Sequence, residues 1–137
     1  MPPDVAQFHE REEPMQRFRE LTEKDVVFSV EAEPEHIPIE GNAMASGDDA
    51  ADQECYDWIH AELDRGNEWA WCSVKVTAAF GNFEGTAYLG ACSYKSEADF
   101  REPGGYFDDL KTEALDDLNQ QWRDALDKAA AILGVPS

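Results

Sequence analysis

The pattern of hydrophobic and polar positions is most regular over residues 69–94, where two apolar and aromatic runs flank a short polar turn. Both runs are rich in β-branched and aromatic residues, and Gly81-Asn82 between them readily adopts the positive φ angles of a two-residue hairpin turn. The pattern therefore predicts an antiparallel β-hairpin whose turn is closed by Phe80 and Phe83.

The alternation of side chains along a strand gives this hairpin two distinct faces. A core face is expected from four cross-strand pairs, which are Ala78 with Gly85, Val76 with Ala87, Val74 with Leu89, and Cys72 with Ala91. The same register places on the other face Trp71 opposite Cys92, Ser73 opposite Gly90, Lys75 opposite Tyr88, and Trp69 near Tyr94. A three-residue turn would instead shift the register by one and mix the two sets.

The second face carries an aromatic patch formed by Trp69, Trp71, Tyr88 and Tyr94. Such a patch is either the packing surface for amphipathic helices, which is the commoner arrangement, or an open surface for a ligand or a partner. If it were open, a homodimer would be the first assembly to expect.

Periodic patterns predict further elements on both sides of the hairpin. Alternation over residues 26–33 indicates a strand, and residues 48–66 indicate a helix that Ser46 or Asp48 caps and Gly66 ends. The apolar stripe of this helix comprises Ala51, Cys55, Trp58 or Ile59, and Leu63. A longer helix is predicted over residues 107–133. Its apolar stripe comprises Leu110, Ala114, Leu118, Trp122, Leu126, Ala129 and Leu133.

These elements predict a single α+β domain over residues 25–137, in which a short antiparallel sheet packs against two or three helices. The sheet contains the central hairpin and the strand at 26–33. Residues 1–24 are expected to form a partly flexible N-terminal segment with a short helix, in which Met15, Phe18 and Leu21 recur at helical spacing.

The charge of the chain narrows the classes of function. Asp and Glu number 30 against 11 Lys and Arg, which gives a formal net charge of −19 over 137 residues. Such a surface repels nucleic acid and anionic membranes and favours basic partners. No apolar run approaches the roughly 20 residues that span a bilayer, and no charged-then-apolar leader opens the chain, so a cytoplasmic protein is expected.

Catalytic, metal and cofactor sites are not expected. The three cysteines contain no CxxC pair, the predicted register points Cys72 and Cys92 to opposite faces, and the histidines show no ligand spacing with them. Adjacent carboxylates lack the spacing of a calcium loop, no glycine-rich phosphate loop is present, and nothing aligns Cys92 or Ser93 with His60 as a nucleophile and base. The sequence therefore predicts a protein that is not an enzyme.

The carboxylates gather in rows on separate elements. Glu31, Glu33, Glu35 and Glu40 form an acidic rim around two prolines. The residues predicted to bind a partner are Asp48, Asp49, Asp52, Glu54 and Asp57 on the middle helix, and Asp108, Asp109, Glu113, Asp116 and Asp117 on the last helix. Solubility alone and adaptation to salt are the alternative explanations of this acidity.

Three segments, GNAMASGDDAAD, NEWAWCSVKVTA and YLGACSYKSEADFREPGGYFDDLKTEALDDLN, carry a resemblance to a family. Across about residues 38–119 the chain resembles small acidic proteins of uncharacterised function encoded by bacteriophages, plasmids and integrative elements. No functional residues are known to carry over from that family. The resemblance implies a setting in which many small acidic proteins inhibit restriction and CRISPR systems, and several of those resemble DNA in charge.

Charge and resemblance together predict a DNA-mimic inhibitor of a host nucleic-acid-binding defence protein, acting as an anti-CRISPR or anti-restriction protein that occludes a basic cleft. Two alternatives remain open at this point. One is a module that binds a small ligand or signal nucleotide through the hairpin aromatics, and the other is an adaptor in phage replication or recombination.

Overall fold

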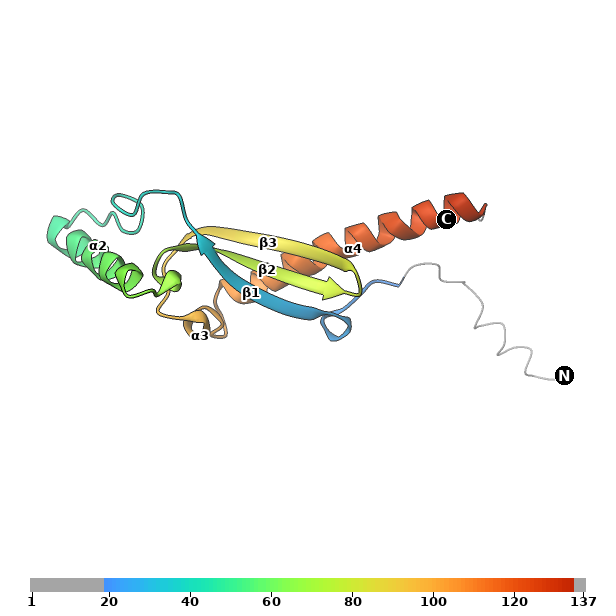
Figure 1. Ribbon diagram of the computed structural model, residues 1–137, viewed down its shortest axis with the longest axis horizontal. Helices are drawn as coiled ribbons and strands as arrows, with labels where there is room; N and C mark the ends of the chain where they lie inside the picture. The colour runs from blue at the N-terminus through green and yellow to red at the C-terminus, as the bar shows by residue number, and fades with distance from the viewer. Residues whose placement is uncertain (1–18, 135–137) are drawn as a thin grey trace.

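The computed structural model describes residues 19–134 and contains one three-stranded sheet with helices at its face and ends (Figure 1). The strands are β1 (Val27–Pro34), β2 (Cys72–Phe80) and β3 (Phe83–Cys92), paired antiparallel in the order β1-β2-β3. The helices are α2 (Asp49–Asp64), α3 (Glu97–Phe100) and α4 (Tyr106–Leu133), with 3-10 turns at Glu23–Asp25 and Glu68–Ala70. The predicted α+β arrangement, with helices packed against an antiparallel sheet, is confirmed.

The hairpin register is confirmed from the turn as far as Val74, which pairs with Leu89. Beyond that point a bulge shifts the register, so that Cys72 pairs with Cys92 and not with Ala91. Ala91 takes up the extra residue with a φ of 54°, a conformation that is uncommon for a residue other than glycine. The prediction that Cys72 and Cys92 point to opposite faces is therefore wrong, because both are buried in the same core.

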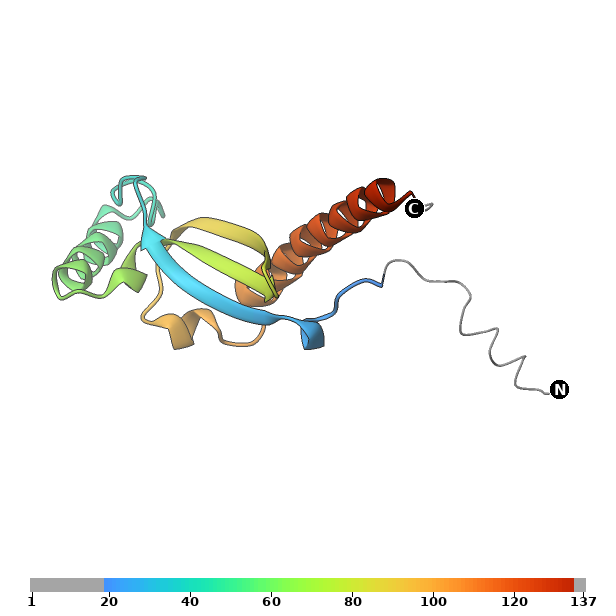
Figure 2. The same ribbon diagram turned by 45° about the vertical axis from the view of Figure 1, so that its right-hand side comes forward.

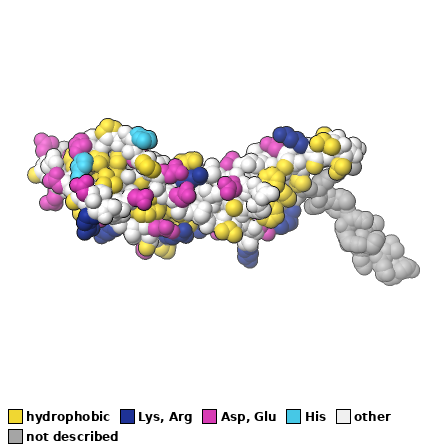
Figure 3. Space-filling view, in the orientation of Figure 1, with side chains coloured by type: hydrophobic (Ala, Val, Ile, Leu, Met, Phe, Trp, Pro, Cys, Tyr) yellow, Lys and Arg dark blue, Asp and Glu magenta, His cyan; other side chains and the backbone are white. Residues whose placement is uncertain are grey.

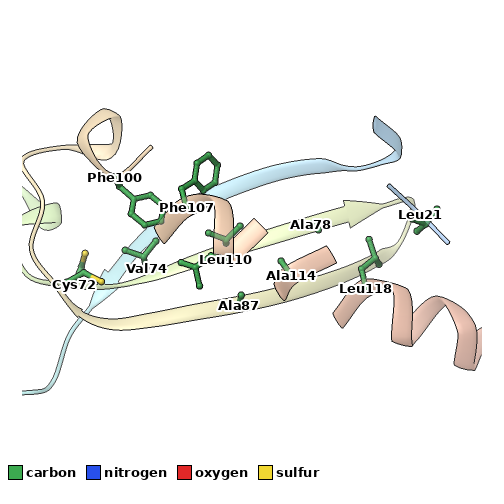
Figure 4. Close-up of a cluster of buried hydrophobic side chains, with 12 residues drawn as sticks. Leu21, Cys72, Val74, Ala78, Ala87, Phe100, Phe107, Leu110, Ala114 and Leu118 are labelled. Atoms are coloured by element: carbon green, nitrogen blue, oxygen red, sulfur yellow. The ribbon is translucent and has the colours of Figure 1, made fainter. Parts of the chain in front are cut away.

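Helix α4 covers the predicted core face of the hairpin (Figure 4). Val74, Val76 and Ala78 are fully buried there, and α4 contributes Leu110, Ala114 and Leu118 to the same cluster. The opposite face, which the sequence analysis expected helices to cover, is polar and partly exposed in the described residues. Tyr88 on that face remains 53% exposed, with the ammonium of Lys75 6.0 Å from its ring.

Gly85 allows the backbone of α4 to pack directly against the backbone of β3, with no side chain between them. A Cβ atom at this position would lie 2.2 Å from the carbonyl oxygen of Ala114 and 2.4 Å from the backbone nitrogen of Leu118. No side chain fits in that space, so glycine here is a packing requirement. Its predicted partner Ala78 is also small, which keeps the layer between sheet and helix thin.

The chain before β1 is tied to the same helix by Asn119. This buried side chain accepts a hydrogen bond from the Leu21 backbone N–H at 2.7 Å and donates one to the Leu21 carbonyl at 3.0 Å. Leu21 is buried outside any helix, at one end of the core (Figure 4). The rest of the predicted N-terminal helix, including Met15 and Phe18, lies outside the described residues.

Helix α2 packs at one end of the sheet on a second, smaller core, which comprises Ile39, Tyr56, Ile59, Ala70 and Trp71 (Figure 2). Its cap and terminator are as predicted, since Asp48 accepts hydrogen bonds from the first turn and Gly66 has a φ of 92°. Of the two alternatives for the stripe, Ile59 is buried and Trp58 is exposed. Ala51 was predicted in the stripe and is exposed, because the buried face is centred on Tyr56 and Ile59.

The apolar stripe of α4 outruns the sheet. Its first half packs on the strands, and its last turns project past them at the end opposite to α2 (Figures 1 and 2). Ala129 and Leu133, predicted as buried, are therefore exposed, and Leu133 is 74% exposed. The stripe is buried only where strands lie beneath it.

The close contact at Gly85 makes a clear prediction. Replacing Gly85 with Ala should lower the free energy of unfolding by about 3 kcal/mol or more, because the added methyl group meets helix backbone that cannot move aside. Chemical denaturation of the two proteins measures this difference. The control is Gly105→Ala, where the nearest atom lies at 3.5 Å and φ is negative, and where a change of about 1 kcal/mol or less is expected. Equal effects of the two substitutions would contradict the packing requirement.

Candidate acidic interface

Three of the predicted partner-binding residues form one exposed row on α4. Asp109, Glu113 and Asp116 are separated by four and three residues, so they lie on one side of the helix. All three are exposed, and within residues 19–134 none of them makes a hydrogen bond or an ion pair. We call these three residues the α4 row. Its charges are free to act on a partner.

The other two predicted residues on α4 are used inside the fold. Asp108 lies 3.6 Å from the ammonium of Lys111. Asp117 accepts a hydrogen bond from the backbone N–H of Thr86 at 2.9 Å and one from the side chain of Gln121 at 3.3 Å. Gln121 also donates to the Glu84 carbonyl at 2.7 Å. Asp117 and Gln121 therefore provide hydrogen-bond partners for backbone groups on the outer edge of β3.

The predicted acidic residues of α2 have different roles from one another. Asp48 caps the helix by accepting from the backbone of its first turn. Asp52 was predicted on the exposed face and is buried, because it accepts three hydrogen bonds from the backbone and hydroxyl of Ser46. Asp49, Glu54 and Asp57 are exposed. Glu54 and Asp57 are neighbours on the helix surface, but Asp49 lies well around the helix from Glu54, and the carboxylate of Asp57 accepts a hydrogen bond from the Gln53 side chain at 2.9 Å. The structure thus leaves no continuous row on α2.

The structure does not bring the two helices into one surface. Helix α2 packs on the second core at one end of the sheet, whereas the first half of α4, which carries the five predicted residues of that helix, packs on the main core against the strands (Figures 1 and 2). The carboxylates are spread over the face shown in Figure 3, with basic side chains between some of them. The α4 row is therefore the coherent part of the predicted interface.

Several basic side chains neutralise carboxylates within the chain. Arg101 bonds to Glu97 at 2.7 Å, and Arg65 pairs with Glu62. Arg19 pairs with Asp25 at 3.2 Å, and this guanidinium, together with the backbone of Thr22, lowers the pKa of Asp25 to about 2. None of these pairs involves the α4 row. The row therefore keeps its negative charge where other carboxylates of the described residues are partly neutralised.

The four aromatic residues of the hairpin do not form one patch. Trp69 stacks on Phe100 and meets Tyr94 edge to face, so these two pack with α3 in the main core. Trp71 lies in the second core, where its indole N–H donates to the Ile37 carbonyl at 2.8 Å. Tyr88 is exposed by itself on the open face of the sheet. They are separated because the 3-10 turn at Glu68–Ala70 takes Trp69 out of the strand pattern before β2 begins, and because the register of β3 shifts beyond Leu89.

The cysteines have the environment of core residues. Burial raises the pKa of the Cys72 thiol to about 12 and that of Cys92 to about 11. A thiol at such a pKa carries almost no thiolate near neutral pH and is a poor nucleophile. His60 bonds to Glu40 at 2.8 Å. Among residues 19–134, no three His, Cys, Asp or Glu side chains are grouped to hold a metal ion, and no helix there is long and apolar enough to cross a bilayer.

Glu35 of the predicted acidic rim is a structural link between distant segments. One of its carboxylate oxygens accepts from the Ala91 backbone N–H at 2.5 Å, and the other accepts from the Ile37 N–H at 3.1 Å. These backbone hydrogen bonds, that of Ala91 above all, lower the pKa of Glu35. The carboxylate thereby holds the bulged residue of β3. Sequence reasoning missed this role, since the two partners are 56 positions apart.

A groove between the end of β1 and α2 was not predicted from the sequence. Residues 34–40 cross one side of it, and Leu63 of α2 and Trp71 lie on the other. The acidic rim was the available signal, but it did not identify the apolar side chains that face it.

Comparisons of the chain with known protein families, with curated proteins and with solved structures find no match.

Glu35 gives a prediction about pH. Its pKa is lowered in the folded state, so its contribution to stability is complete above its ordinary pKa near 4.5 and is lost as the pH falls through the lower folded value. Wild type should therefore exceed Glu35→Gln in unfolding free energy by a constant amount above about pH 5.5, and the difference should shrink below about pH 4.

Urea denaturation between pH 3 and pH 7 measures this difference. The control is Glu102→Gln, since Glu102 is exposed and its side chain makes no hydrogen bond in the described chain, and it should change stability little. A difference for Glu35→Gln that grows as the pH falls would contradict the assignment.

Proposed function

We propose that this protein is a DNA-mimic inhibitor that binds the basic nucleic-acid cleft of a host defence protein. It acts by occupying the cleft and needs no chemistry of its own. The observation that carries the proposal is the α4 row, three exposed carboxylates in one line on a rigid helix, in a chain of net charge −19.

The physical basis is the electrostatics of a basic cleft. Proteins bind duplex DNA with arrays of Lys and Arg, and much of the affinity comes from the release of counterions. A row of carboxylates on a helix offers such an array fixed negative charges a few ångströms apart, since each residue advances about 1.5 Å along the axis. Complementary charge also speeds the encounter of the two proteins.

The packing of α4 supports this role. Leu110, Ala114 and Leu118 are buried on the side of the helix that faces the sheet, and the row lies on the side that does not. The helix is thus fixed by one face and displays the other. A setting in a mobile element, which we expect from the sequence alone, would favour a target in a defence system.

The alternative of a small-ligand module on the hairpin aromatics has weaker support. It relied on four aromatic side chains around one surface, and these side chains lie in two cores and on an open face.

The proposal predicts competition with DNA. The protein should displace a fluorescein-labelled DNA duplex from restriction and CRISPR nucleases that bind it through a basic cleft, because both ligands occupy the same site. Fluorescence anisotropy measures the displacement. Its affinity should fall steeply as salt rises, by at least tenfold between low and physiological salt. Failure to displace DNA from any such nuclease, or displacement that is insensitive to salt, would overturn the proposal.

Charge-neutral variants of the α4 row test the site itself. The triple variant Asp109→Asn, Glu113→Gln, Asp116→Asn should weaken inhibition by about tenfold or more and reduce the salt dependence, because three contacts are lost. The matched control is Glu20→Gln, Asp64→Asn, Glu102→Gln, which removes three exposed charges elsewhere. Equal loss in both variants would mean that net charge, and not the row, determines binding.

A further inference from the structure

The groove between β1 and α2 has an apolar floor and an acidic rim. Its main part has a volume of about 430 Å³ and its narrower extension about 150 Å³. Pro34, Leu63 and Trp71 line both parts, so the two parts are adjacent. Figure 3 shows hydrophobic side chains gathered between histidines at the α2 end of the molecule.

The floor is held rigidly by the second core. The Trp71 indole is fixed by its hydrogen bond to the Ile37 carbonyl, and Ile37 itself is 43% exposed along the groove. The loop behind it is tied down as well, because the hydroxyl of Tyr56 accepts from the Gly41 N–H at 2.9 Å and donates to the Met44 carbonyl. A rigid groove costs little entropy when a ligand enters it.

The narrow extension places two carboxylates over this floor. Glu33 comes from the end of β1 and Glu68 from the turn before β2. Within residues 19–134, neither side chain has a hydrogen bond or an ion pair. The main part adds Glu35 and Glu40, and no Lys or Arg lines either part. The groove is therefore apolar beneath and negative at the edge. In its main part His60 contacts Glu40 at 2.8 Å, whereas Glu33 and Glu68 in the narrow extension have no ion pair within the described chain.

We propose that this groove binds an extended basic segment of a partner protein. The aliphatic stem of one Lys or Arg lies on Pro34, Leu63 and Trp71, and its charged head reaches Glu33 and Glu68. Long basic side chains combine an apolar stem with a charged end, and a cation near an indole is further stabilised by the ring. The neighbouring residues of the segment lie along the main part of the groove, where Ile37 offers apolar contact.

This site is separate from the α4 row, since it is built from β1, α2 and the turn before β2. It does not depend on the proposed inhibition of a DNA-binding protein. Charge complementarity selects the occupant, because an apolar peptide would leave the carboxylates unused and an acidic one would be repelled.

The test is a titration of the whole protein, labelled with nitrogen-15, with the probe peptide acetyl-Gly-Leu-Arg-Leu-Lys-Gly-amide. The backbone signals of Glu33, Leu63 and Glu68 and the indole signal of Trp71 should shift and saturate. The same peptide with Gln in place of Arg and Lys should bind at least fivefold more weakly. Spermidine, which has charge without side chains, should not shift the Trp71 indole signal.

Variants distinguish binding of the peptide in the groove from nonspecific electrostatic attraction to the acidic protein. Glu33→Gln with Glu68→Gln should weaken peptide binding by roughly five- to tenfold, in line with the loss of two exposed ion pairs. Asp64→Asn with Glu102→Gln removes the same charge elsewhere and should change it less than about twofold. The α4-row triple variant should bind the peptide like wild type.

Three results of the peptide titrations would overturn the proposal. They are an equal loss of affinity in the groove variant and the control, signal shifts centred on α4, and the absence of saturable binding by the basic peptide. Stronger binding of spermidine than of the peptide at the Trp71 indole would also overturn it, because it would assign the pocket to a small polycation. The spectrum of each variant without peptide shows whether its fold is intact.

Discussion

The fold depends on one close contact, the approach of the α4 backbone to β3 at Gly85. Because no side chain intervenes there, the helix lies low enough for Leu110, Ala114 and Leu118 to fill the space above the sheet. Asn119, one residue beyond this contact, then fixes the chain entering β1. One glycine thus determines the depth at which both chain segments pack.

The sequence predicted the parts of the fold that depend on local chemistry. The Gly81-Asn82 turn gave the correct register as far as Val74, and Asp48 and Gly66 gave the limits of α2. The bulge at Ala91 was not predicted, because it is held by Glu35 from a distant segment. The alternating pattern carried no sign of it. This one irregular residue brings both hairpin cysteines into one core, and the 3-10 turn at Glu68–Ala70, which was also not predicted, takes Trp69 out of the predicted aromatic patch.

The sequence predicted that the candidate site is made of carboxylates, but it did not predict which carboxylates are exposed and unpaired. A sequence cannot distinguish a carboxylate that displays charge from one that accepts backbone hydrogen bonds, since the partners are remote. Asp52 and Asp117 proved to be structural acceptors, whereas Asp109 and its neighbours in the row did not. Apolar periodicity had the same limit, because the stripe of α4 continues past the last strand that could bury it. Contact between elements, which no single element encodes, decides both questions.

The α4 row has a cost for the helix that carries it. Asp109 with Glu113, and Glu113 with Asp116, are like charges at neighbouring positions of the helix surface, and each such pair destabilises a helix by roughly 0.2–0.5 kcal/mol. The burial of the opposite side of α4 offsets this repulsion. A cationic surface that binds the α4 row would reduce this repulsion. Binding at the row and folding of the helix are therefore thermodynamically linked. The exposed face of the helix therefore carries a like-charge repulsion that dissolved salt or a bound cationic group reduces.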